Sequence, residues 1–132
     1  MGGLPVNLKE QSFEEGLRSH GFQEVDAAFD TSGKGAARQT CLQILGKRGV
    51  LICIGHGETL NLNVSPDLIA TERAVLGSEY FRFDELPANL ELLRAHGAYL
   101  RQIITHRFGV GEIQPAFELL FRGETGKVVI EQ

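Results

Sequence analysis

The chain has few cysteines, no block of basic residues and no long apolar run. Its two cysteines among 132 residues, Cys41 and Cys53, lack CxxC partners. Both are therefore predicted to be small core residues in a reducing compartment, which indicates a cytoplasmic protein. A formal net charge of −4 without a basic cluster argues against nucleic acid and anionic membranes as partners. The apolar runs are too short for a membrane span, and the N-terminus lacks the pattern of a signal peptide.

Motifs for metal binding or nucleophilic catalysis are also missing. No two of the histidines share a metal-ligand spacing, and no cysteine or carboxylate joins them in a metal motif. His20 and His96 are expected in the last turns of helices, where a cation suits the helix dipole, and His106 is expected in a loop. Only His56 is predicted to lie at a cleft. No serine occupies a nucleophile elbow and no catalytic carboxylate pair is recognisable, so the residues predict no catalytic machinery of their own.

Glycine-rich segments that could cradle phosphates match the known patterns poorly. Gly33-Lys34-Gly35 lies between an expected strand and an expected helix, but Arg38 stands where the dinucleotide fingerprint needs a small residue. Gly55-His56-Gly57 is followed by an alternating segment rather than a helix. The Gly-Lys pair at 126–127 lacks the other Walker residues. Asp30, at a strand end, is a candidate phosphate acceptor by position, but this interpretation is dropped because Asp30 has no upstream acidic pair to hold magnesium.

The segment 49–57 is the centre of the predicted fold. Five apolar residues run unbroken over 50–54, which predicts a strand that is covered on both faces. Glycines close the run at both ends, and Gly55 and Gly57 allow a tight turn and close approach to another group. Because ligands collect at the carboxyl ends of strands in open α/β sheets, residues 54–56 form a candidate binding edge.

Short apolar strands alternate with amphipathic helices along the chain. Strands are expected at 4–8, 25–30, 50–54, 59–64, 74–77 and 127–130. Helices are expected at 13–20, 35–45, shortly after 65, at 84–96 and at 113–121. Ser12 and Glu15 have capping-box spacing for the first helix. The pattern predicts an α/β fold with a mostly parallel sheet and helices on both faces, in one domain over residues 1–132.

Several segments resemble the medium-chain, zinc-type alcohol dehydrogenases. Residues 25–33, 49–55 and 75–78 are similar to the fourth, fifth and sixth strands of the family's nucleotide domain. The tail, with 104–108, 116–120, Gly123 and 126–129, matches the family's closing segment in order and spacing. The resemblance covers the chain from about residue 6 onward. Two parts of a family member have no counterpart in this sequence: the half of the nucleotide domain that carries the glycine loop, and the catalytic domain that carries the zinc ligands.

The resemblance implies the second half of a Rossmann-type domain with its closing helix and strand. It would be the nucleotide-binding portion of an NAD- or NADP-dependent oxidoreductase that acts on a small alcohol or carbonyl substrate by hydride transfer. Zinc is possible in a longer parent, but this chain has no ligands for it, and the chain alone is expected to be inactive. The alternatives are a zinc-free quinone oxidoreductase type and a non-catalytic binding module or remnant.

The resemblance also assigns nicotinamide contacts to particular residues. Ile54, Gly55 and His56 would lie along the nicotinamide, with backbone groups bonded to its carboxamide. Ser78 and Tyr80 would add main-chain contacts to the same group.

The remaining implied contacts concern the rest of the dinucleotide and a partner subunit. Thr31 and Ser32 would border the path of the nucleotide, and Lys127 would lie near the pyrophosphate, where a cation is favourable, unless it is a solvated lysine at a strand start. The strand near Ala74 and Ser78 would form a homodimer edge. The strand at 25–30 would have a bare edge, which a rearranged N-terminal segment or another subunit is expected to cover.

Overall fold

The computed structural model describes residues 2–132, which form two compact units, one ending at Tyr80 and one running from Phe81 to Gln132. The elements of the first unit are α1 (Phe13–Ser19), β1 (Val25–Asp30), α2 (Gly35–Gln43), β2 (Leu45–Cys53), the π-helix η1 (Val64–Ile69) and β3 (Ala74–Gly77). β1 and β3 have the predicted bounds. The assignment of the whole chain to one domain stays a prediction.

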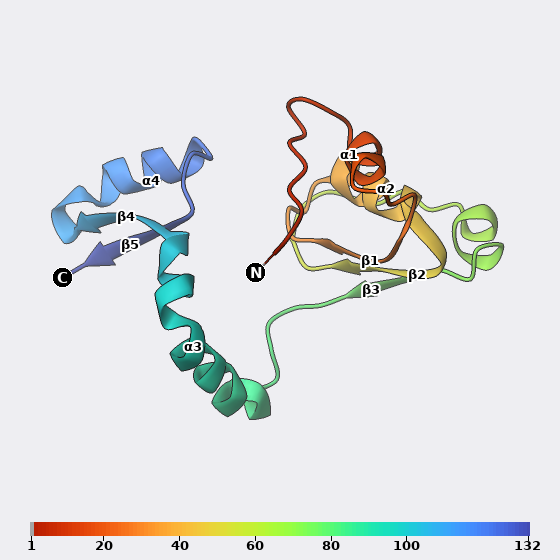
Figure 1. The fold of residues 1–132 in the computed structure, drawn as a ribbon. Helices are drawn as coiled ribbons and strands as arrows, with labels where there is room; N and C mark the ends of the chain where they lie inside the picture. Colours follow the sequence, from red (N-terminus) through yellow and green to blue (C-terminus); the bar gives the residue numbers. More distant parts are fainter. Residues whose placement is uncertain (1) are drawn as a thin grey trace. The chain divides into compact units, whose positions relative to one another are not determined.

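The first unit is built on a three-stranded parallel sheet in the order β1-β2-β3 (Figure 1). Its register places Asp30 beside Cys53, and Cys53 beside Gly77. α2 packs on the face that carries Ala28 and Leu51, and together with Leu42 and Leu45 these residues form the core. The parallel sheet with its flanking helix confirms the predicted Rossmann-type α/β class.

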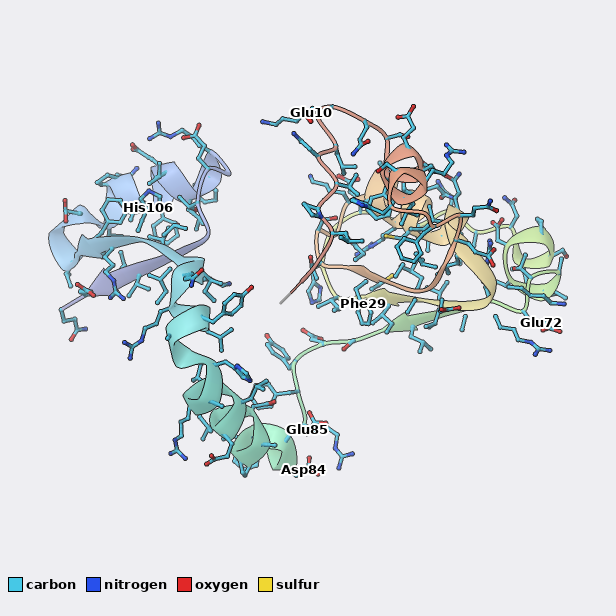
Figure 2. The ribbon with its side chains drawn as sticks, in the orientation of Figure 1. Glu10, Phe29, Glu72, Asp84, Glu85 and His106 are labelled. Carbon is cyan, nitrogen blue, oxygen red and sulfur yellow. The ribbon has the colours of Figure 1, made fainter. Side chains whose placement is uncertain are left out.

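The opposite face of this sheet contradicts the prediction that β2 is covered on both sides. Phe29 and Leu76 lie in register on either side of Ile52, and their exposed fractions are 61% and 53%. Figure 2 shows Phe29 on the side of the strands away from α2. The unbroken apolar run of β2 is typical of a doubly covered strand, but the described residues of this unit supply a helical layer on one face only.

The N-terminal segment does not form the strand predicted at 4–8. It is irregular and is followed by a turn, and its Val6 side chain packs against Gly16 of α1. Among residues 2–132 no strand pairs with the outer edge of β1. The edge of β1 therefore has no strand partner among these residues, and its cover by a rearranged N-terminal segment or by another subunit stays a prediction.

Local capping signals were reliable. The Ser12 hydroxyl accepts the Glu15 N–H at 3.2 Å, and the Glu15 carboxylate accepts the Ser12 N–H at 2.8 Å. The second bond holds the pKa of Glu15 below its usual value, because it favours the charged carboxylate. This capping box starts α1 as predicted, since all of its groups lie within four residues.

The start of β2 and the predicted strand at 59–64 differ from expectation. β2 begins at Leu45, where helix was predicted, and its register with β1 shifts between Leu45 and Val50, where Arg48 has a φ of 66°. Residues 59–64 form no strand, because their backbone and side chains serve other contacts: Leu60 packs on the core and the Asn63 N–H is donated to Asp67. η1 begins within this range, at Val64, with Asn63 rather than Ser65 as its N-cap.

The second unit is a two-stranded parallel sheet with its own helices. Its elements are η2 (Phe83–Glu85), α3 (Leu86–Leu100), η3 (Arg101–Ile103), β4 (Ile104–Gly109), η4 (Val110–Glu112), α4 (Ile113–Phe121) and β5 (Lys127–Glu131). β4 pairs with β5, so His106 lies in a strand and not in the expected loop. α3 continues past its expected end, with a kink at His96. In Figure 2, the labels of Asp84 and Glu85 mark the end of η2, directly before α3.

Candidate functional site

The three strands of the first unit end side by side, which brings three short segments together. Because the strands are parallel and in register, residues 31–35, 54–58 and 78–80 leave the sheet at the same edge, called here the carboxyl edge. Direct hydrogen bonds join these segments. Asp30 O accepts the N–H groups of Ile54 and Gly55 at 2.8 and 3.0 Å, and Cys53 O accepts the N–H of Ser78 at 3.0 Å.

Seven of the eight predicted cofactor-binding residues lie at the carboxyl edge. They are Thr31, Ser32, Ile54, Gly55, His56, Ser78 and Tyr80. The eighth, Lys127, begins β5 in the other compact unit. Whether any of the eight contacts a dinucleotide stays a prediction.

The surface of the carboxyl edge combines one apolar side chain with polar neighbours. Ile54 is 41% exposed, and the His56 and Glu79 side chains approach each other at 3.3 Å between Nε2 and Oε1. Tyr80 is 88% exposed and has a φ of 55°, a conformation that non-glycine residues rarely adopt. The N–H groups of Ile54, Gly55 and Ser78 are already donated within the protein, and the Gly55 carbonyl oxygen accepts a hydrogen bond from Arg38. The backbone groups that a ligand could meet are therefore the carbonyl oxygens of Ile54 and Ser78.

The glycines of the carboxyl edge bring two loops into backbone contact. A Cβ on Gly33 would lie 1.9 Å from the carbonyl oxygen of His56, and one on Gly55 would lie 2.3 Å from the Gly33 nitrogen. Gly33 also has a φ of 70°, which favours glycine. The close approach inferred from the sequence is therefore an approach of one loop of the protein to another.

Asp30 is a buried carboxylate that sequence reasoning considered only as a phosphate acceptor. Its exposed fraction is 3%. It accepts the Ser32 hydroxyl at 2.7 Å, the Ser32 N–H at 2.8 Å, and the Gly33 N–H at 3.2 Å. These bonds, the Ser32 hydroxyl foremost, together with Arg38, lower the pKa of Asp30 to about 2, although burial opposes the shift. Asp30 is therefore charged at neutral pH and holds the first loop in place.

Arg38 completes the charge balance of this site. Its Nε lies 2.9 Å from Asp30 Oδ2, and the side chains of the two residues are 12% and 2% exposed. Its other guanidinium nitrogens donate to the carbonyl oxygens of Gly55 and Glu58. The sequence had indicated Arg38 only as the residue that spoils a glycine fingerprint.

Glu58 occupies the N-terminus of α2, where a phosphate loop would bind its anion. Its Oε2 accepts the Gly35 N–H at 2.8 Å, and Oε1 lies 3.4 Å from Lys34 Nζ. The Gly35 bond first, and Lys34 next, lower the pKa of Glu58. A protein carboxylate therefore already meets the positive end of this helix, next to Gly33-Lys34-Gly35.

The described residues do not fit a zinc ion. Within residues 2–132 no group of three or more histidine, cysteine, aspartate or glutamate side chains is placed to hold a metal. Cys41 is half-buried, and burial raises the pKa of its thiol, which disfavours the thiolate that metals bind. In the same part of the chain, no helix combines the length and apolar character needed to cross a membrane.

Comparison with known proteins identifies relatives of the chain. Residues 5–95 match the sequence profile described as zinc-binding dehydrogenase. An uncharacterised zinc-type alcohol dehydrogenase-like protein of Escherichia coli is 32% identical over 106 residues, which cover 80% of this chain and 30% of that protein. An L-threonine 3-dehydrogenase of Deinococcus deserti is 28% identical over 109 residues, covering 80% of this chain and 31% of that protein. The chain thus spans about a third of the length of these relatives.

Solved structures share the fold at lower identity. An alcohol dehydrogenase from Thermus sp. ATN1 matches with a TM-score of 0.82 and 18% identity over 99% of this chain and 39% of that one. An alcohol dehydrogenase from Thermotoga maritima matches with a TM-score of 0.80 and 20% identity over 96% of this chain and 37% of that one.

Proposed function

Because this chain belongs to the zinc-binding dehydrogenase family, we propose that its carboxyl edge is the nicotinamide-side part of a dinucleotide site in an NAD- or NADP-dependent oxidoreductase. The substrate of the complete site is a small alcohol or the corresponding carbonyl compound. The observation that carries the proposal is the convergence of residues 31–32, 54–56 and 78–80 at the ends of three parallel strands.

The residues of the edge suit an amide-bearing planar ring. Ile54 offers an exposed apolar side chain against which a ring can pack. The carbonyl oxygens of residues 54 and 78 can accept the N–H groups of a carboxamide, whereas the N–H groups of these residues are engaged within the protein. The dinucleotide, when bound, supplies or accepts the hydride. The protein residues hold and orient its ring.

We propose that catalysis and part of the cofactor site depend on groups outside this chain. The described residues include no zinc ligand set, and Glu58 fills the N-terminus of α2, so the pyrophosphate is held elsewhere, with Lys127 as a proposed contact. We propose a homodimer through β3, which is an edge strand of the described sheet, and a cytoplasmic location. We expect the purified chain to turn over no alcohol.

The test is a titration of the ¹⁵N-labelled chain with NADH and with NADPH, followed by amide NMR shifts. We expect weak binding, with shifts confined to residues 31–32, 54–56 and 78–80. Ile54→Ser should reduce these shifts, whereas Ile69→Ser, which changes an equally apolar residue that is 67% exposed on η1, should not. Shifts that map elsewhere, or an identical response in both variants, would contradict the proposal.

A further inference from the structure

We infer that Arg38 is a positioning residue for the nicotinamide side of the carboxyl edge, an inference that rests on the proposed function. Arg38 lies on α2, outside the eight predicted cofactor contacts, yet its guanidinium joins α2 to two other segments. It pairs with Asp30 at the end of β1 and donates to Gly55 O and Glu58 O in the loop after β2. Those two carbonyls lie on either side of His56 in the sequence.

Arginine fits this place because its guanidinium is a flat fork with donors in several directions. One nitrogen meets a carboxylate while two others meet separate carbonyl groups. A lysine carries its charge at a single point and cannot reach all three partners in the same planar geometry. The side chain is 12% exposed, so water competes little for these bonds, and the loop loses its anchors if the guanidinium is removed.

The anchoring determines where the loop after β2 runs. Three backbone hydrogen bonds hold residues 54–58 independently of Arg38. The N–H groups of Ile54 and Gly55 are donated to Asp30 O, and the Glu58 N–H is donated to Gly33 O. The His56 side chain is 83% exposed and approaches Glu79, and within residues 2–132 no hydrogen bond joins the His56 side chain to Arg38. Arg38 therefore acts on the carboxyl edge through the backbone on both sides of His56, and its proposed role involves no direct contact with the nicotinamide ring.

The experiment compares three variants of the full chain by amide hydrogen exchange. Arg38→Met removes the fork. Arg38→Lys keeps a cation beside Asp30 but loses the two contacts to Gly55 O and Glu58 O. This variant tests the inference if Arg38→Met does not fold. Arg48→Met is the matched control, because Arg48 is 77% exposed and pairs with Glu72 at 2.6 Å in the same unit.

We expect the amides of Gly55 and Glu58 to exchange roughly tenfold faster in Arg38→Met and several-fold faster in Arg38→Lys, because local opening of the loop becomes easier. The Ile52 amide inside the sheet should be unchanged, and Arg48→Met should leave all three amides as in the wild type. In the NADH titration, the two Arg38 variants should show weakened shifts at 54–56 with shifts at 78–80 less affected.

Exchange at 55 and 58 that is unchanged in both Arg38 variants would overturn the inference, whether or not the dinucleotide binds. Equal acceleration at Ile52 would also overturn it, because Arg38 would then stabilise the unit as a whole. Faster exchange at residues 55 and 58 combined with unchanged NADH-induced shifts would also overturn the inference, because the order of this loop would then not affect dinucleotide binding at the carboxyl edge. Absence of NADH shifts in the wild type would instead reject the proposed function, and with it the positioning role of Arg38, while the exchange data would still show whether Arg38 holds the loop.

Discussion

Replacement of Asp30 by asparagine should remove a large part of the acid sensitivity of the first unit. Asp30 is ionised in the folded protein down to a pKa of about 2, against an ordinary value of 3.8. A folded-state pKa that is lowered stabilises the protein above the unfolded pKa, and this stabilisation is lost as the pH falls through the folded pKa. At about 1.4 kcal/mol per pKa unit, the shift corresponds to on the order of 2 kcal/mol, lost between about pH 4 and pH 2.

The asparagine variant should also be less stable at neutral pH. Breaking one side of a buried ion pair costs roughly 3–5 kcal/mol. We expect about 3 kcal/mol here, because Arg38 keeps some solvent exposure and asparagine retains one acceptor oxygen. The difference in unfolding free energy between wild type and Asp30→Asn should therefore shrink by about 2 kcal/mol between pH 5 and pH 2.

The assay is urea unfolding at pH 7, 5, 3 and 2, followed by the amide NMR signals of β2 so that the unit containing Asp30 is observed directly. Asp26→Asn is the control, because Asp26 lies on the same strand but is exposed. It should follow the wild type at every pH. If wild type and Asp30→Asn lose stability in parallel from pH 5 to pH 2, the buried Asp30–Arg38 pairing does not contribute as the structure indicates.

Three further predictions concern single groups. Gly33→Ala should destabilise the first unit by more than about 2 kcal/mol, because Gly33 has a left-handed φ and an added Cβ would clash with the opposite loop. Gly77→Ala is the control: its Cβ would meet open space, so the free energy of unfolding should change by under about 0.5 kcal/mol. Urea unfolding of both variants tests the difference. Ser12→Ala should cost about 1 kcal/mol by loss of the α1 cap, and exchange of the α1 amides will show no change if the cap is unimportant. Glu58→Gln should weaken the cap on the Gly35 N–H, so the melting temperature should fall more at low salt than at high salt; a fall that is independent of salt would contradict an electrostatic role.

Short-range features of the fold could be predicted from the sequence. The capping box at Ser12 and the strand at Val25–Asp30 appear as predicted, because their determinants lie within a few neighbouring residues. The strand predicted at 59–64 failed for the opposite reason. Its alternating pattern is real, but Leu60 is drawn to the core and Asn63 to a helix cap, and such tertiary contacts override a local preference.

The candidate site shows the same division. Residues 54–56 were expected at a binding edge from strand topology, and the resemblance to the dehydrogenases added residues 31–32 and 78–80, which the parallel register does bring to the same edge. The network of Asp30, Arg38 and Glu58 could not be predicted, because it joins residues up to 28 positions apart whose pairing depends on two loops meeting through glycines. The exposed face at Phe29 was also missed, since an apolar run indicates that a strand can be covered, not that the covering layer is present.

The most direct test of the central proposal is an intermolecular NOE experiment on the full chain with NADH in excess. If the carboxyl edge is the nicotinamide side of a dinucleotide site, the ring protons of the nicotinamide should show NOEs to the Ile54 methyl groups and to amide protons of residues 78–80. These NOEs should weaken in Ile54→Ser. NOEs from the nicotinamide only to residues outside the carboxyl edge would contradict the proposal.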